Sequence, residues 1–271
     1  MAHLLPEIRI DQAISPKNQL LFASDFHLGA PHPAASRQRE LKVLDWMREH
    51  QDHTRALFLV GDVFDFWHEY RHVVPKGHVR LLGKLAEWVE HGIDIHLFTG
   101  NHDLWMFGYL EQEIGLQIHR GPRYMQAGGQ HFYLAHGDGL GPGDHGYKML
   151  KRLFTNRFCQ WVFRQLHPDW GIGMAYYFSR TSRRHTGCRD ACFLGPEKEW
   201  LILHSNALLR SRHFDYFIYG HRHYPVEWPL TGPDGRQSRY LNLGDWIRYF
   251  SYASFDGQNL ELQYYTPVSV V

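Results

Sequence analysis

Five short clusters of polar residues occur along the sequence, and each follows an apolar run typical of a β-strand. They are Asp25-Phe26-His27, Gly61-Asp62-Val63-Phe64-Asp65, Gly100-Asn101-His102-Asp103, His136-Gly137-Asp138 and Gly220-His221-Arg222-His223. Imidazole, carboxylate and carboxamide groups without a thiolate suit Mn²⁺, Fe²⁺, Zn²⁺ or Mg²⁺ better than a soft ion. Seven such groups from five strand ends can hold two divalent ions that share one carboxylate. The residue types therefore predict two-metal phosphoester chemistry.

The elements that must position these groups alternate between strand and helix. Strand-like runs cover residues 19–23, 56–60, 93–98 and 132–135, and helical spacing of apolar residues covers 37–50 and 77–91. Further apolar runs at 214–219, 226–230, 239–243, 250–253 and 260–264 predict a second, mostly antiparallel sheet. We therefore expect an α/β fold, a two-sheet β-sandwich flanked by helices, with its site beyond the strand carboxyl ends.

Residues 145–212 follow neither pattern. Helices are expected over 147–166 and 196–210, around an aromatic segment that begins at Trp170. From His145 to Arg189 there are nine Lys and Arg and one acid, a local charge of +8 in a chain whose net charge is +1. We predict a core of residues 1–144 and 213–271 with an inserted helical, basic and aromatic cap at 145–212. The aromatic residues either line an apolar slot or form the core of the cap.

Composition limits the class of protein. A chain of 271 residues that is 44% hydrophobic can form a full core, and its near-zero net charge predicts no nucleic-acid partner. Three cysteines in one segment are expected to be reduced thiols of a cytosolic protein. We expect no signal peptide, because Glu7 and Asp11 interrupt the N-terminal segment. No run reaches the ~18 apolar residues of a membrane span, and nothing in the sequence indicates an oligomeric state.

The five clusters, in this order, resemble those of the calcineurin-like metallophosphoesterases from residue 21 to about residue 245. The resemblance implies that fold, and it implies two divalent metal ions, which we expect to be Mn²⁺. One ion would be held by three side chains and the other by three more, with an aspartate bridging both. The first ion would be held by Asp25, His27 and His223, and the second by Asn101, His136 and His221. Asp62 would bridge the two ions.

The same resemblance implies how the reaction proceeds. A hydroxide would attack phosphorus in line, while His102 protonates or hydrogen-bonds the leaving oxygen. Asp65 would orient the imidazole of His102, as a carboxylate partner commonly does. The alternative for Asp65 is that its side chain caps the N-terminus of a helix.

The segment from His136 to Asp144 leads from a metal ligand directly into the predicted cap. This arrangement is similar to a branch of the family that cleaves the pyrophosphate bond of a lipid-linked nucleotide sugar. The resemblance implies a cap that takes up acyl chains and a cytoplasmic protein peripherally associated with the inner membrane, at its inner leaflet. Lys148, Lys151 and Arg152 would then meet phosphate or anionic lipid. The candidate substrate contacts are Asn101, His102, Asp144, Tyr147, Lys148, Ser182, Arg183 and His221.

Two other functions remain open at this point. A phosphodiesterase or pyrophosphatase of the same fold that acts on a soluble nucleotide would not need an aromatic cap. A binding scaffold with a degraded metal site is disfavoured, because all seven ligand candidates and His102 are present.

Overall fold

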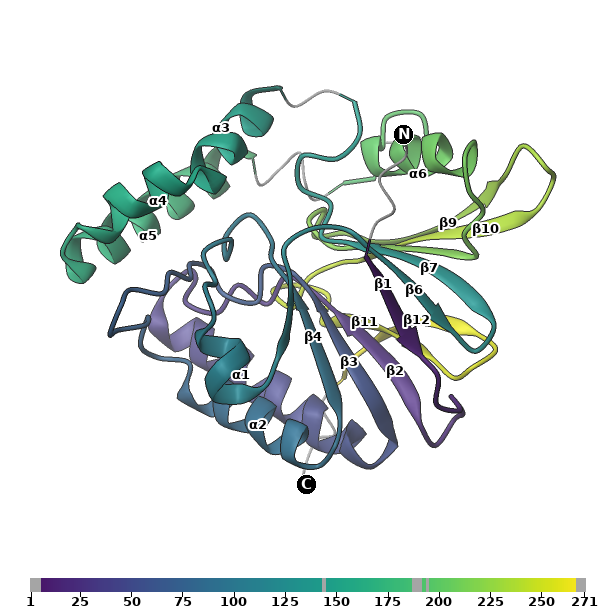
Figure 1. The fold of residues 1–271 in the computed structure, drawn as a ribbon, viewed down its shortest axis with the longest axis horizontal. Helices are drawn as coiled ribbons and strands as arrows, with labels where there is room; N and C mark the ends of the chain where they lie inside the picture. The colour runs from purple at the N-terminus through teal and green to yellow at the C-terminus, as the bar shows by residue number, and fades with distance from the viewer. Residues whose placement is uncertain (1–5, 143–144, 187–191, 194, 267–271) are drawn as a thin grey trace.

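A computed structural model describes residues 6–142, 145–186, 192–193 and 195–266, and its strands form two six-stranded sheets packed face to face (Figure 1). The first sheet consists, in spatial order, of β12 (Leu260–Tyr264), β11 (Ser251–Phe255), β2 (Gln19–Ala23), β3 (Thr54–Val60), β4 (Asp94–Phe98) and β5 (Gln117–His119). The second consists of β1 (Glu7–Ile10), β6 (Arg123–Ala127), β7 (Gln130–Ala135), β8 (Tyr216–Tyr219), β10 (Gln237–Leu243) and β9 (Pro225–Thr231). The predicted two-sheet α/β sandwich is confirmed.

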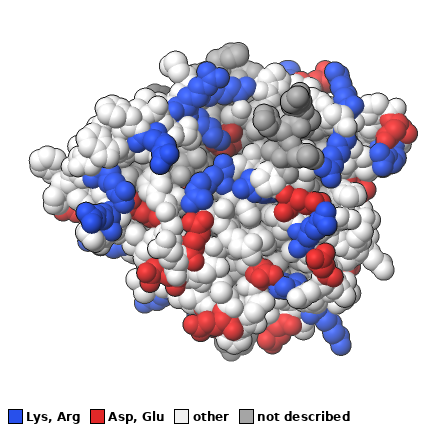
Figure 2. All heavy atoms as spheres, viewed as in Figure 1, with Lys and Arg blue, Asp and Glu red and all other residues white. Residues whose placement is uncertain are grey.

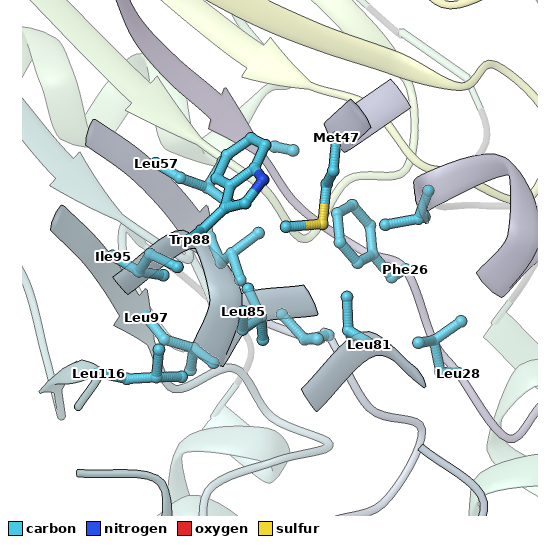
Figure 3. Close-up of a cluster of buried hydrophobic side chains, with 14 of the residues drawn as sticks. Phe26, Leu28, Met47, Leu57, Leu81, Leu85, Trp88, Ile95, Leu97 and Leu116 are labelled. Carbon is cyan, nitrogen blue, oxygen red and sulfur yellow. The ribbon is translucent and has the colours of Figure 1, made fainter. Parts of the chain in front are cut away.

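The first sheet is buried on both faces, which explains why its central strands are apolar throughout. Leu21 and Ala23 of β2 face α1 (Pro33–His50) and α2 (Val79–Glu90), whereas Leu20 and Phe22 face the second sheet. Figure 3 shows the helix-covered layer, in which Met47, Leu85 and Trp88 lie near Leu57, Ile95 and Leu97. Short helical turns follow at η1 (Gln51–His53) and η2 (Leu110–Ile114).

A helix also covers the outer face of the second sheet. Leu201 and Ile202 of α6 (Trp200–Leu209) pack with Tyr133, Phe217 and Tyr240 of the sheet. The sandwich therefore has a helical layer on each side, and three apolar layers hold it together.

The prediction of a mostly antiparallel second sheet built by the C-terminal strands is wrong. β11 pairs antiparallel with β2, so the C-terminal hairpin extends the first sheet instead. β8 lies in the second sheet, parallel to both β7 and β10. An apolar run shows that a strand is buried, but it does not specify which strand lies beside it. The sequence analysis also missed β1, β5 and β6, which are short or rich in polar residues.

Three helices lie outside the sandwich: α3 (His145–Thr155), α4 (Arg157–Arg164) and α5 (Pro168–Thr186) (Figure 1). The helix predicted over 147–166 is divided in two, because the side chain of Asn156 accepts hydrogen bonds from the backbone of Phe158 and Cys159, at 2.9 and 3.2 Å. The division into a core and a cap at 145–212 stays a prediction. In the described part of the chain, no helix is long and apolar enough to cross a membrane.

Candidate metal centre

Every candidate metal ligand follows the carboxyl end of a strand. Parallel pairing of β2, β3 and β4 brings one set to the same sheet edge, and parallel pairing of β7 and β8 brings the other. In chain order the ligand candidates are Asp25 and His27 after β2, Asp62 after β3, Asn101 after β4, His136 after β7, and His221 and His223 after β8. The two edges face each other, so one site forms between the sheets.

The first group of side chains matches the first predicted set of ligands. His27 Nε2 lies 3.6 Å from Asp25 Oδ1 and 3.2 Å from His223 Nε2, and His223 Nε2 lies 3.4 Å from Asp25 Oδ1. These atoms are close enough to one another to share one ion. Asp25 and His27 are fully buried.

The second group lies beside the first, and Asp62 lies between them. Asp62 Oδ2 is 3.7 Å from His27 Nε2 in the first group and 3.4 Å from His136 Nε2 in the second. Asn101 Oδ1 is 3.2 Å from His136 Nε2 and 2.9 Å from His221 Nδ1. The structure thus brings all seven predicted ligands together, with Asp62 in the position that a bridging ligand needs. Their roles as ligands stay predictions.

The backbone at these positions is strained. Asp25, His27, Asp62, His221 and His223 all have φ between 44° and 70°, a left-handed conformation that residues other than glycine rarely adopt. Such strain persists only where the surrounding structure enforces it, and it is concentrated at functional sites. Its occurrence at five of the seven candidate ligands indicates a site that is held in place before any ligand binds.

Hydrogen bonds orient the ligand side chains from behind. His136 Nδ1 donates to the carbonyl oxygen of Val60 at 2.8 Å, which directs Nε2 into the site. His223 Nδ1 donates to Asp245 Oδ2 at 3.2 Å, and Asp245 itself accepts backbone hydrogen bonds from residues 247–249. The sequence analysis did not select Asp245, although Gly244-Asp245 directly follows the apolar run at 239–243, as the five clusters follow theirs.

Glycine is required where the loops of the site cross. A Cβ atom on Gly100 would lie 2.1 Å from Asp62 Oδ1, and one on Gly220 would lie 2.6 Å from Asp25 Oδ2. Side chains at these positions would displace the carboxylates. The two glycines of the sequence clusters therefore serve the packing of the centre.

The electrostatic field of the centre favours positive charge. Burial by itself would lower the pKa of His27, but the carboxylates of Asp25 and Asp65, each 3.6 Å from a ring nitrogen, raise it to about 10. Burial opposes protonation of His136 too, yet the charge of Asp62 raises its pKa to about 10. Asp25 Oδ1 is buried without a hydrogen-bond partner among the described residues. A carboxylate oxygen of this kind, surrounded by imidazole nitrogens, fits a divalent cation.

His102 and Asp65 lie together at the edge of the centre. His102 Nδ1 donates to the backbone oxygen of Asp65 at 3.0 Å, but it lies 3.7 Å from Asp65 Oδ1. Ser179 Oγ lies beside both side chains. No helix begins within residues 61–78, so Asp65 is not a helix N-cap. The resemblance pointed only to the stretch from Ser179 to Arg183 as a source of further contacts, and it gave Ser179 no role of its own.

The basic and polar side chains predicted to contact substrate or lipid from the cap are only partly described by the structure, and three of those on α3 contact the core. The Tyr147 hydroxyl donates to Asp138 Oδ2 at 2.6 Å, and Lys148 Nζ donates to the Gly141 oxygen at 2.6 Å. Lys151 forms an ion pair with Asp138 at 2.5 Å. These side chains therefore connect α3 to the segment after His136. Ser182 and Arg183 lie on α5, but their side chains are outside the described part of the structure. Asp144 lies outside the described residues.

A cavity of about 410 Å³ opens beside His136, between the core and α3 and α4. Its lining combines polar groups with apolar side chains of the core: Asp138, Lys151, Gln160, Leu104, Met106 and Phe107. Space of this size and mixed polarity suits part of a small-molecule substrate.

Residues 19–225 match the family described as Calcineurin-like phosphoesterase. The chain belongs to this family, and the fold and the site together define a metal-dependent hydrolase of phosphoesters. It is 37% identical over 261 residues to UDP-2,3-diacylglucosamine hydrolase of Porphyromonas gingivalis, a match that covers 91% of this chain and 97% of that protein. The proteins of the same name from Edwardsiella ictaluri and Pseudomonas aeruginosa are 26% and 28% identical, over 89% and 84% of this chain and 90% and 91% of theirs.

Proposed function

We propose that this enzyme hydrolyses the pyrophosphate bond of UDP-2,3-diacylglucosamine and releases UMP and 2,3-diacylglucosamine 1-phosphate (lipid X), a step of lipid A biosynthesis. The observation that carries the proposal is the 37% identity to the Porphyromonas gingivalis protein of that name, over 91% of this chain. The predicted ligand side chains and His102 are all present in one site, which supports turnover rather than binding alone.

The residues of the centre divide the work between binding and proton transfer. Two divalent ions, which we propose to be Mn²⁺, would be held by the groups around Asp25 and His136, with Asp62 between them. When bound, such ions stabilise charge on phosphoryl oxygens and make water a stronger nucleophile. His102 would supply a proton or a hydrogen bond to the leaving oxygen.

The proposal is tested by incubating the metal-loaded protein with UDP-2,3-diacylglucosamine and with a panel of soluble nucleotides. We expect UMP release from the lipid-linked substrate to exceed release from any soluble nucleotide. Comparable or faster turnover of a dinucleoside polyphosphate or a cyclic nucleotide would replace the proposal with the soluble-nucleotide function. A chain that turns over neither substrate with Mn²⁺ would contradict both.

The surface of α3 to α5 supports an acylated substrate. Most of the exposed large apolar side chains among the described residues lie on these helices: Met149, Leu150, Leu153, Phe158, Trp161, Val162, Trp170, Met174, Tyr177 and Phe178. Other aromatic residues of the same helices face the core, and Phe163 packs on Trp105 with ring centroids 4.6 Å apart. The two alternatives for the aromatic residues therefore apply to different side chains. We propose that the exposed set contacts acyl chains or the lipid surface.

Trp161→Ala is expected to raise the KM for the diacylated substrate without changing the rate for a small chromogenic diester, which has no chains to bury. Because each buried CH₂ contributes ~0.8 kcal/mol, shortening the acyl chains should raise KM stepwise in the wild type and less steeply in the variant. Tyr264→Ala, which removes an exposed aromatic residue of β12, is the matched control. A flat dependence of KM on chain length in the wild type would contradict an acyl-binding cap.

We also propose that the protein binds the inner leaflet of the membrane peripherally. Several Lys and Arg side chains lie over the region of α3 to α5 in Figure 2, whereas acidic side chains gather along the lower edge. Arg152 and Arg157 are exposed there, while Lys148 and Lys151 bond to the core. Membrane attraction would thus depend on the arginines, and the two lysines would serve the site.

Arg152→Ser combined with Arg157→Ser is expected to reduce flotation with vesicles that contain anionic lipid. Because exposed charges are screened within ~8 Å at physiological ionic strength, added salt should have the same effect on the wild type. Lys151→Ser is expected to slow turnover and leave flotation unchanged, since Lys151 pairs with Asp138. Equal flotation of the double arginine variant and the wild type at low salt would contradict the membrane proposal.

A further inference from the structure

The carboxylate of Asp65 and the imidazole of His102 are connected through a third side chain. His102 Nδ1 is 3.7 Å from Asp65 Oδ1, which is too far for a hydrogen bond. Ser179 Oγ lies 3.1 Å from Asp65 Oδ1 and 3.3 Å from His102 Nδ1. The hydroxyl therefore spans the distance that separates the two groups.

The directions of these hydrogen bonds are fixed by the chemistry of the partners. A carboxylate only accepts, so the Ser179 hydroxyl donates to Asp65 Oδ1. The backbone oxygen of Asp65 also only accepts, so Nδ1 of His102 carries a proton and donates. The lone pairs of Ser179 Oγ can then accept from the same Nδ1–H. This arrangement fixes the plane of the imidazole and directs Nε2 away from Asp65.

Ser179 reaches this position because α5 is docked on the core. Ser179 is buried, with 9% of the residue exposed. Tyr176, one turn earlier on α5, packs edge-on against Phe66 with ring centroids 6.2 Å apart. A Cβ atom on Gly29 would lie 3.1 Å from the Tyr176 hydroxyl, so α5 approaches the loop after β2 closely. Residues three positions apart lie on one helix face, and the contacts of Tyr176 thus hold Ser179 over the pair.

We propose that Ser179 is a positioning residue through which the docked α5 orients His102 for proton transfer. The inference rests on the proposed hydrolytic role of His102. In that step a new P–O bond forms to the oxygen of the attacking water, which releases a proton to solvent, and the P–O bond to the leaving group breaks. The leaving oxygen takes its proton from His102, which regains one from solvent. Ser179 exchanges no proton. His102 would therefore reach its catalytic orientation only when α5 is in place.

The test compares variants of the metal-loaded full chain on aryl phosphodiesters with different leaving groups. Ser179→Ala should lower kcat roughly tenfold for a phenyl leaving group, as expected for the loss of one orienting hydrogen bond. A p-nitrophenyl group needs little protonation, so its kcat should change far less. KM and metal content should stay at wild-type values. Ser179→Thr keeps the hydroxyl and should restore most of the rate.

Thr181→Ala is the matched control, because this hydroxyl on the same helix donates only within the helix, to the Tyr177 oxygen. In the His102→Ala background, Ser179→Ala should cause no further loss of rate. The proposal would be overturned if Ser179→Ala lowered kcat as much in the His102→Ala background as in the wild type, or equally for both leaving groups. Either result would show that Ser179 acts on the substrate or on cap stability.

A second readout needs no turnover. The ¹⁵N shift of His102 Nδ1, assigned from the signal that disappears in His102→Ala, should move in Ser179→Ala and stay in place in Thr181→Ala. An unchanged shift in Ser179→Ala would overturn the proposal by itself. Failure of the wild type to hydrolyse any phosphoester would instead contradict the proposed function, so the two failures are distinguishable.

Discussion

Asp62→Ala is expected to cause the largest loss of activity of any single substitution in the centre. Its carboxylate lies 3.7 Å from an imidazole nitrogen of the first ligand group and 3.4 Å from one of the second, as a ligand shared by two ions must. Removal of a general acid typically slows a reaction by ~10²–10⁴-fold, and loss of a shared metal ligand should exceed that range. Metal analysis should show fewer bound ions per chain than in the wild type.

The control for Asp62→Ala is Asp234→Ala, which removes an exposed carboxylate that pairs with Arg236 in the turn between β9 and β10. This variant should keep its metal and its rate. Asp62→Asn keeps the shape of the side chain and lacks its charge, so it should lose metal as well. Equal metal content in Asp62→Ala and the wild type would remove the basis for the bridging role.

His102→Ala is expected to slow hydrolysis by ~10²–10⁴-fold, the range for loss of general acid catalysis. Metal content should not change, because it is the backbone nitrogen of His102 that donates to Asp62 Oδ1, at 2.9 Å, and alanine retains this group. The loss should be greatest for substrates with a poor leaving group. The measurements are kcat across a series of leaving groups and the metal content of each variant.

His72→Ala is the matched control, since His72 is exposed and lies outside the centre. It should retain the wild-type rate. If His102→Ala lost metal together with activity, its effect would be on the assembly of the centre, and the proton-transfer role would be contradicted.

The sequence determined the class of fold, and it predicted side chains that the structure brings together in one centre. Strands that are buried on both faces must be apolar. For this reason β2, β3, β4 and β7 could be recognised in the sequence as continuous runs of apolar residues. The ligands follow those strands directly, and parallel strands carry their carboxyl ends to one edge. Local sequence therefore sufficed to place Asp25, Asp62 and Asn101 near one another, before any pairing of the sheets was known.

Only the tertiary structure decided which distant segments meet. The C-terminal hairpin pairs with β2 rather than with β8 to β10, and no local pattern encodes the identity of a neighbouring strand. Ser179 and Asp65 are 114 residues apart, and Lys151 pairs with Asp138 across the start of α3. Both contacts depend on how α3 and α5 dock on the core. A helix shows its own period in the sequence, but the surface that it covers depends on the shape of the rest of the fold.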